Sequence, residues 1–561
     1  MEAAFTAEEV ASLARRTAQR KAVFGPLAPW LLKQACAQLA PLAAAEFNAW
    51  QRIGRLPRGD AHSAIALVAK TSSPTQPSDL RGIAVGALLA KLFAAGLERR
   101  VTAHAEAAGL HAEGQFGFRR QRITEQAALA LRTVIECHRQ QRQCGGSSTR
   151  SEQPQRRHTR RRRQRGGSQL WACFVDFKQA YDRVPRAQLW QRLESMGYGG
   201  QWLRAVRALY ADVPMSVTAP GLEGRVFSAT QGLKQDCPLN PTPLHCGLTV
   251  NVVKTKVMLL SGAADEQTAM QRVRRARHTF DGAPVAGVAA FKYLGIVFHC
   301  TQPVGEAAAE GRARVARFAA ASFEGRCTAL GLEAARLLLS LYRQMVDSTL
   351  SYGAAVWSPG LALAAVRRLG TQAGAAGGGS GLSAAEQQHY RTLRRLLGLP
   401  QRAPRATVLA ETGEPPLHAH WMARTARFWN SLVAAPEGSL MRQVLDASLQ
   451  LAAEHTPSRH RGPHGIAQMP WAAQLQSALA EAGIAADLQQ RQPLQPEAVQ
   501  EAALLHYLQH LQTAVQRRGA SRLQHYFDCV RPECLEVAGY GMAPYLVERP
   551  PCMMGACAGV R

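Results

Sequence analysis

Acidic residues and long apolar runs are both scarce in this chain of 561 residues. The first scarcity makes the chain basic, and the second argues against a protein that spans a membrane. Asp and Glu together number 40 against 67 Lys and Arg, so the formal net charge at pH 7 is +27. This charge favours nucleic acid as the partner, with a membrane-surface binder or an ordinary basic protein as the alternatives. No apolar run reaches transmembrane length and no basic-then-apolar leader starts the chain, so we expect no membrane span and no secretion. Hydrophobic residues make up 47%, which predicts that most of the chain folds.

The twelve cysteines are scattered along the chain, and several, such as Cys173, stand in apolar contexts. This usage predicts reduced thiols in an intracellular protein, nuclear or cytoplasmic. The C-terminal region holds five residues of metal-ligating type: His525, Cys529, Cys534, Cys552 and Cys557. Their spacings fit no zinc knuckle, so free cysteines are expected there.

The stretch Leu170–Asp182, LWACFVDFKQAYD, is the most informative part of the sequence. Leu170–Val175 is a short apolar run that predicts a buried strand, and Asp176 follows at the point where the strand leaves the core. A carboxylate there can be presented to a metal ion or a substrate. The alternative is a plain strand–helix unit with a capping aspartate, because Pro185 then starts a helix.

Five further blocks accompany this stretch: Arg81–Gly86 (RGIAVG), Gln115–Gln126 (QFGFRRQRITEQ), Gln231–Pro241 (QGLKQDCPLNP), Asn251–Met258 (NVVKTKVM) and Phe291–Phe298 (FKYLGIVF). The six blocks stand in the order of the finger, palm and primer-grip motifs of reverse transcriptases from non-LTR (LINE-type) retrotransposons. The chain resembles that family from about Pro41 to Pro359, with a looser match beyond.

The resemblance implies an α+β fold: a right-hand polymerase of fingers, palm and thumb, followed by a mostly helical C-terminal region. The expected segments are an N-terminal helical region (1–60), fingers (61–138), a basic disordered insertion (139–169), an incomplete palm with the primer grip (170–300), a thumb (301–369), a Gly-rich linker (370–382) and the helical C-terminal region (383–561).

The parent activity in that family is RNA-directed DNA synthesis, in which a primer 3′-hydroxyl attacks the α-phosphate of a dNTP with two Mg²⁺ ions bound. By resemblance, Asp176 is a magnesium ligand and Lys254 lies near the leaving phosphates. Tyr181 is the gate that rejects a 2′-hydroxyl, and Gln231 and Gly232 position the template. The implied partners are an RNA template, a DNA primer or RNA–DNA hybrid, and a dNTP.

Basic residues of the predicted fingers would meet the phosphates of the dNTP or the template backbone, because a triphosphate needs fixed cations. These residues are Lys70, Arg81 and Arg119. Without the motifs, each one would be interpreted as an ordinary solvated cation. The primer-grip strand pair is expected to hold Phe291, Tyr293 and Gly295.

The chain departs from the family at the second palm motif, which normally carries paired aspartates on a hairpin. Pro238–His245 runs directly into Cys246–Met258, and no Asp-Asp pair occurs anywhere in the sequence. Tyr210-Ala211-Asp212 precedes the Gln-Gly loop and is therefore out of order, and Asp236 stands where the family has glycine. One carboxylate cannot hold two magnesium ions, so we expect a degenerate copy without polymerase activity, through a deletion or an error in the gene sequence.

Other interpretations remain open at this stage. The chain could be a non-catalytic nucleic-acid-binding remnant, or a product that does not fold. Arg156–Arg165 could be a nuclear localisation signal, an RNA-binding arm or a neutral insertion. In the predicted thumb helix, Arg312, Arg314 and Arg317 are expected to meet backbone phosphates, with a solvated helix face as the alternative.

Overall fold

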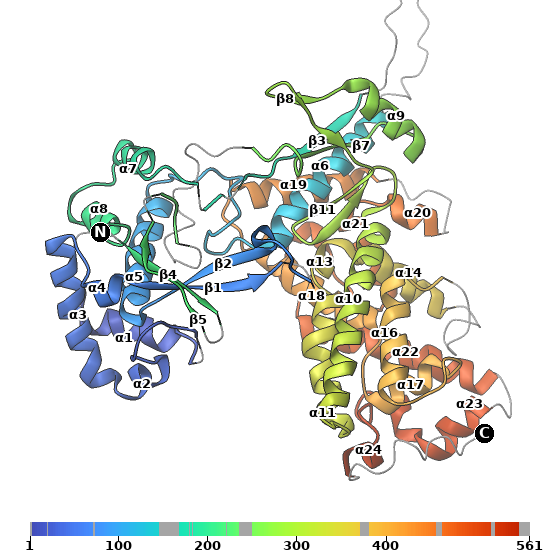
Figure 1. The fold of residues 1–561 in the computed structure, drawn as a ribbon. Helices are drawn as coiled ribbons and strands as arrows, with labels where there is room; N and C mark the ends of the chain where they lie inside the picture. Colours follow the sequence, from blue (N-terminus) through green and yellow to red (C-terminus); the bar gives the residue numbers. More distant parts are fainter. Residues whose placement is uncertain are drawn as a thin grey trace, which may run out of the picture. The chain divides into compact units, whose positions relative to one another are not determined.

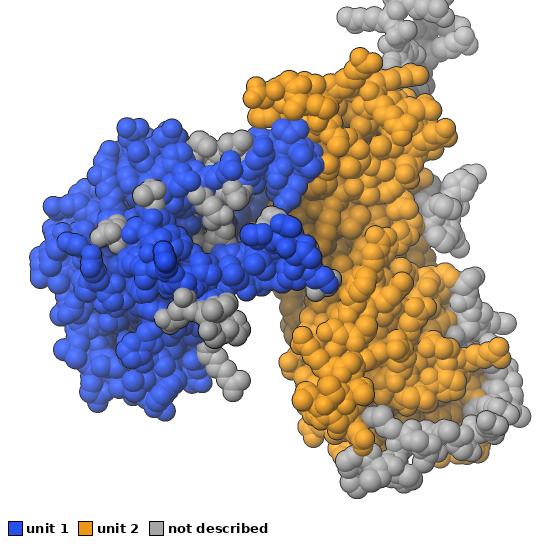
Figure 2. Space-filling model, viewed as in Figure 1, with its two compact units in different colours: residues 1–122, 175–255 blue, residues 123–174, 256–561 orange. Residues whose placement is uncertain are grey.

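The computed structural model describes residues 3–19, 21–70, 73–144, 168–178, 180–181, 183–211, 213–219, 222–229, 231–234, 250–370, 381–455, 463–517 and 522–548. The chain divides into two compact units, residues 1–122 with 175–255 and residues 123–174 with 256–561 (Figure 2). The predicted insertion at Arg156–Arg165 and most of the predicted linker at 370–382 lie outside the described residues. Within these ranges, no helix is long and apolar enough to cross a membrane.

The first unit combines helices with one sheet (Figure 1). Its elements are α1 (Ala7–Arg16), α2 (Pro29–Gln34), α3 (Cys36–Ile53), α4 (Arg58–Ala61), β1 (Ser63–Ala69), the 3₁₀ turn η1 (Pro77–Asp79), β2 (Leu80–Gly86), α5 (Leu88–Ala107), α7 (Arg186–Ser195), α8 (Gly200–Ala208), β4 (Pro214–Ala219), β5 (Leu222–Glu223) and β6 (Phe227–Ser228). The helices over the first 60 residues confirm the helical prediction for that region.

The sheet of the first unit runs in the order β2-β1-β4-β5, with β6 also paired to β4. β1 and β2 form an antiparallel pair in which Ser63 faces Gly86 and Ala69 faces Leu80. β1 pairs with β4 in parallel, so a segment of the predicted fingers and one of the predicted palm share a sheet. The helical side of the unit is packed by aromatic rings, and Phe93 lies 5.3 Å from Phe47 and 5.4 Å from Trp50 between ring centroids. Burying three such rings removes several hundred Å² of apolar surface from water, which is a large part of the stability of a unit this size.

The second unit is mostly helical (Figure 1). It begins with α6 (Thr124–Cys144) and then has β3 (Leu170–Phe174), β7 (Lys256–Ser261), α9 (Glu266–Ala276), β8 (Thr279–Phe280), β9 (Ala283–Pro284), β10 (Ala286–Gly287), β11 (Ala290–Tyr293) and β12 (Ile296–His299).

The helices that follow are α10 (Val304–Ala329), α11 (Ala335–Tyr342), the π-helical turn η2 (Arg343–Asp347), α12 (Ser348–Leu350), α13 (Ala354–Trp357), α14 (Pro359–Leu369), α16 (Ala384–Leu396), α17 (Arg405–Thr412), α18 (Leu417–Val433), α19 (Leu440–Glu454), α20 (Pro463–Gln468), α21 (Trp471–Glu481), η3 (Leu488–Gln490), α22 (Pro496–Arg517), α23 (Arg522–His525), η4 (Tyr526–Val530), η5 (Pro532–Leu535) and α24 (Pro544–Glu548). Their packing puts the predicted thumb and the C-terminal region in one core, because α10 packs on α16 and α14 packs on α21.

The second unit has a three-stranded sheet in the order β10-β7-β3 and two separate hairpins, β8-β9 and β11-β12. β3 pairs antiparallel with β7, so it is an edge strand of the sheet that the described residues form. The sequence led us to expect a buried strand over Leu170–Val175. Instead, β3 is half-buried, and Cys173 is exposed on it. An edge strand has one neighbour, so its outer side chains stay in contact with solvent.

Helix α6 joins the C-terminal helices through the buried Arg132. Its guanidinium pairs with Glu136 on the same helix at 2.6 Å and donates to the carbonyl of Val356 and to Gln474 Oε1, at 2.8 Å for the latter. We expected this helix to end near Cys137 and to belong to the fingers. It continues to Cys144 because HRQQRQC consists mainly of good helix formers, and it lies in the second unit.

Candidate functional site

Asp176 and the segment Asn251–Thr255 come together in the first unit. The backbone N–H of Asp176 donates to Thr255 Oγ1 at 3.1 Å, and the backbone N–H of Asn251 donates to the carbonyl of Asp176 at 2.7 Å. Phe177 also pairs with Val250 in an antiparallel bridge. The main chain of Asp176 is therefore fixed from both sides, which leaves its half-buried carboxylate on a rigid support.

Lys254 belongs to the same arrangement. Its backbone N–H donates to the carbonyl of Asn251 at 3.1 Å, and the N–H of Thr255 donates to that same carbonyl at 2.8 Å. These bonds close a tight turn, on which the Lys254 side chain is exposed to solvent. The structure thus brings the two predicted catalytic residues, Asp176 and Lys254, to one hydrogen-bonded junction.

The carboxylates that the structure describes do not make up a two-metal centre. In the described ranges, no group of three or more His, Cys, Asp or Glu side chains is placed to hold a metal ion. Asp182, Asp212 and Asp236 lie outside those ranges. Magnesium requires several oxygen ligands in octahedral geometry, and a pair of ions requires shared carboxylates. Asp176 alone does not fit that requirement.

The predicted template loop, Gln231-Gly232, is bonded to the segment that carries Tyr181. The N–H of Gly232 donates to the carbonyl of Val184 at 3.0 Å, and the N–H of Leu233 donates to the carbonyl of Tyr181 at 2.7 Å. Gly232 has φ = 78°, a left-handed conformation that glycine adopts without strain. The Gln231-Gly232 loop therefore lies beside the segment Tyr181–Val184.

Arg186 is a functional candidate that the sequence reasoning missed. Its guanidinium donates to the carbonyls of Gly232, Tyr210 and Ala229, each at 2.8 Å. Burial lowers the pKa of Arg186, and these carbonyls replace the water that it loses. In the sequence, the signal for Arg186 was its position as the first residue of the helix after Pro185. A positive charge there interacts unfavourably with the helix dipole, so the arginine is expected to have a role other than stabilising the helix.

Lys70 and Arg81 lie at the same end of the β1-β2 pair. Arg81 faces Val68 across the pair, and the N–H of Lys70 donates to the carbonyl of Asp79 at 2.7 Å. Both side chains are exposed. The pKa of Asp79 is lowered, first because its carboxylate accepts backbone N–H bonds from the turn that precedes β2. This end of the hairpin therefore carries two exposed basic side chains, next to a carboxylate that accepts bonds from its own turn and also interacts with Lys70.

Arg119 is placed differently from these two cations. Its guanidinium forms a bidentate pair with Glu106, with Nη2 2.7 Å from Oε2 and Nε 3.0 Å from Oε1. A third bond runs from Nη1 to the carbonyl of Ala112 at 3.0 Å. The hydrogen bond from Arg119 lowers the pKa of Glu106, although partial burial of that carboxyl acts the other way. In this structure the guanidinium fixes the loop after α5, so a phosphate would have to compete with Glu106 for it.

The predicted primer-grip residues form a hairpin in the second unit. β11 and β12 are joined by Leu294 and Gly295, both with positive φ, as in a two-residue type I′ turn. The ring of Phe291 stacks on that of Phe174 with centroids 4.0 Å apart, and Tyr293 lies 5.8 Å from the same ring. Aromatic stacking thus fixes one face of the hairpin against β3.

Two side chains hold the tip of the β11-β12 hairpin. Tyr352 Oη donates to the carbonyl of Leu294 at 3.3 Å, and Arg312 donates to the carbonyls of Gly295 and Thr349. The expectation that Arg312 would be available to phosphates is therefore wrong, because its side chain is buried and bonded inside the fold. Arg314 and Arg317, on the same helix, are exposed.

The C-terminal cysteines show no metal-site arrangement in the described part of the chain. Cys534 is buried and its Sγ lies 3.8 Å from the carbonyl of Ala410, whereas Cys529 and His525 are exposed. Cys552 and Cys557 lie outside the described residues.

Comparison of this chain with the models of known protein families and with curated proteins found no match. The motifs and the geometry above are therefore what any assignment of function rests on.

Proposed function

We propose that this chain is of reverse-transcriptase type, related to non-LTR retrotransposon enzymes, and that it binds RNA and DNA without extending a primer. The observation that carries this proposal is the junction of Asp176 with Asn251–Thr255. Two segments that resemble separate palm motifs, far apart in the sequence, are joined by a backbone-to-hydroxyl bond of 3.1 Å and a backbone–backbone bond of 2.7 Å. A polymerase palm needs that convergence, because the carboxylate and the phosphate-binding cation act on one nucleotide.

Under this proposal the first unit supplies fingers and part of the palm, and the second supplies the primer grip and thumb of a right-hand polymerase. Lys70 and Arg81 would meet nucleotide or template phosphates from the end of their hairpin, where both side chains are exposed. Lys254 would meet the phosphates beside Asp176. Arg186 is a positioning residue, because it acts through the carbonyls of the Gln231-Gly232 loop.

We expect the chemical step to be lost because the chain lacks the carboxylates that would bind two Mg²⁺ ions. The sequence has no Asp-Asp pair, and the segment that would carry one is missing between Pro243 and Cys246. If the paired aspartates were present, the bound Mg²⁺ ions would supply charge stabilisation to the transferred phosphate. Nucleic-acid binding depends instead on Lys and Arg, and the chain has 67 of these.

The test is primer extension on an RNA template with three proteins. These are the chain itself, a chimera with a paired-aspartate hairpin inserted between Pro243 and Cys246, and that chimera with Asp176→Asn. We expect all three to bind a primer–template, and only the second to extend it in Mg²⁺. Magnesium-dependent extension by the unmodified chain would overturn the loss of activity. Failure of all three to bind primer–template would overturn the assignment itself.

A further inference from the structure

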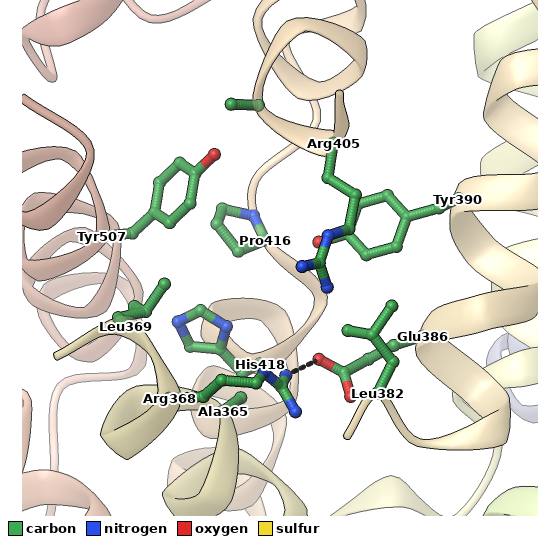
Figure 3. A pocket seen from close by; sticks show the side chains of 11 residues that line it. Ala365, Arg368, Leu369, Leu382, Glu386, Tyr390, Arg405, Pro416, His418 and Tyr507 are labelled. Atoms are coloured by element: carbon green, nitrogen blue, oxygen red, sulfur yellow. Dashed lines mark hydrogen bonds and ion pairs between the residues drawn. The ribbon is translucent and has the colours of Figure 1, made fainter. Parts of the chain in front are cut away.

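Helix α22 carries two histidines, one helical turn apart, that have no role in the proposed function. His506 and His510 are separated by four positions, so their side chains are neighbours on the helix surface. Both are half-buried, whereas Tyr507 between them is buried. Figure 3 shows Tyr507 on the wall of a pocket within the second unit, together with His418. One side of α22 thus lines the interior of the unit, and the histidine pair lies where solvent still reaches the helix.

The two imidazole rings approach each other through their Nε2 atoms. The Nε2 atoms of His506 and His510 lie 3.2 Å apart, although the ring centroids are 4.5 Å apart. Because these nitrogens are closer together than the ring centres, the rings converge at their Nε2 ends. Two nitrogens that each bind one Zn²⁺ ion at about 2.0–2.1 Å lie about 3.3 Å from each other in tetrahedral geometry. The observed separation therefore fits two ligands of one ion.

A hydrogen bond between the two rings is the other explanation of this contact. One Nε2 would then carry a proton and donate it to the other, and 3.2 Å is at the long end of the range for such bonds. The buried Nδ1 of His506 makes no hydrogen bond within the part of the chain that the structure describes. No neighbour there fixes which nitrogen of His506 carries the proton, and a metal ion at Nε2 would select the tautomer protonated at Nδ1.

We propose that His506 and His510 bind one Zn²⁺ ion, with water completing the coordination. Neutral imidazole is a good ligand for zinc, and two histidines four positions apart on a helix can bind one zinc ion from the same face. Among the described residues, no third His, Cys, Asp or Glu joins them, so water fills the remaining positions. The ion links two turns of α22, whose Leu508 and Leu511 lie in the core of the second unit. Because the two ligands come together only in the helix, zinc binding stabilises the folded state.

The experiment is isothermal titration of the full, metal-free chain with ZnCl₂ and with MgCl₂ at neutral pH, after alkylation of its accessible thiols. We expect a zinc site that Mg²⁺ does not occupy, because Mg²⁺ requires oxygen ligands. His510→Gln should weaken zinc binding at this site at least about tenfold, because two linked ligands are reduced to one. Zinc should also raise the melting temperature of the unmodified chain and not that of the variant. Unchanged zinc affinity in His510→Gln would overturn the proposal and leave the hydrogen bond between the rings as the explanation.

A spacing variant separates this pair from zinc binding by single histidines, of which the chain has 17. The double variant His510→Gln with Gln512→His keeps two histidines on α22 but separates them by six positions, so they no longer share one face. Gln512 is exposed, so this change should leave the fold intact. We expect the double variant to bind zinc as weakly as His510→Gln. Binding restored to the level of the unmodified chain would show adventitious binding and overturn the proposal. His506→Gln should give the same loss as His510→Gln, and it replaces that variant if His510→Gln fails to fold.

Discussion

The hydroxyl oxygen of Thr255 accepts the backbone N–H of Asp176 at 3.1 Å, across 79 residues of sequence. Thr255 is buried, so its hydroxyl makes this bond inside the fold. One side chain therefore helps to fix the main chain that carries the Asp176 carboxylate.

Replacing Thr255 with valine tests that bond. Thr255→Val keeps the shape of the side chain and removes the acceptor, so the N–H of Asp176 is left unpaired. We expect the free energy of unfolding to fall by about 1–3 kcal/mol, measured by urea denaturation. Thr279→Val, at an exposed strand position, is the control and should change stability by less than about 0.5 kcal/mol. Equal effects from the two variants would contradict the assigned role.

Arg186 should contribute to both stability and template binding. Arg186→Met keeps the apolar stem and removes the donors to the carbonyls of Gly232, Tyr210 and Ala229. We expect a loss of about 2–4 kcal/mol in unfolding free energy, because several buried carbonyls lose a charged partner. Arg192→Met, at an exposed position of the same helix, should lose under about 0.5 kcal/mol. If Arg186→Met leaves both the unfolding free energy and the RNA affinity unchanged, Arg186 has no role in the site.

The hairpin tip at Gly295 should reject any side chain. Gly295 has φ = +87°, and a Cβ there would lie 2.7 Å from Cε1 of Tyr352. Gly295→Ala thus adds a clash to backbone strain, and we expect a loss of about 2–4 kcal/mol. Gly331→Ala is the matched control, since Gly331 has φ = +60° but open space around its Cα. It should cost about 1–2 kcal/mol from strain alone, and the difference between the two variants measures the clash.

Acid should destabilise the second unit through two buried histidines. Burial lowers the pKa of His389 to about 4 and that of His418 to about 3, against 6.5 for the unfolded chain. The unfolded state therefore binds more protons as the pH falls below 6.5, so stability decreases between pH 6.5 and about 4. Each histidine should account for about 2 kcal/mol between pH 6.5 and 5. Urea midpoints measured across that range should depend less steeply on pH in His389→Gln than in the unmodified chain. An unchanged slope would show that His389 does not contribute to the pH dependence of stability.

Salt dependence should reveal backbone binding of nucleic acid. The logarithm of the affinity for single-stranded RNA should fall linearly with the logarithm of salt concentration, with a slope of about −0.7 per phosphate neutralised. The double variant Arg314→Gln with Arg317→Gln removes two exposed cations of α10 and should make the slope shallower by about 1.4. Arg16→Gln, on α1 outside the family resemblance, should leave the slope unchanged. An affinity that is insensitive to salt would contradict the proposed binding mode.

The sequence predicted local elements better than their tertiary roles. The strand before Asp176, the helix after Pro185 and the hairpin at Phe291–Phe298 follow from apolar runs and turn residues, which act over a few positions. The exposure of β3 and the burial of Arg312 were missed because both depend on partners far away in the chain.

The same reasoning explains which site candidates the sequence suggested. Lys254 and Gly232 were singled out because motif order places them, whereas Arg186 looked like one more cation among many. Its role depends on three carbonyls that only folding brings together. Charge patterns alone do not distinguish a buried arginine with backbone acceptors from a solvated one, which is also why Arg312 was interpreted as a phosphate contact.

The bond from Arg132 to Gln474 also orders the folding of the nascent chain. The two residues are separated by 342 positions, and Val356, the other acceptor, is 224 positions from Arg132. At about 5–20 residues per second, a ribosome needs roughly 20–70 seconds to add the residues between Arg132 and Gln474. During that interval α6 exposes a face that ends up buried, and Arg132 has Glu136 on its own helix as a partner but not yet Val356 or Gln474. The second unit therefore completes this part of its core only after synthesis has passed residue 474.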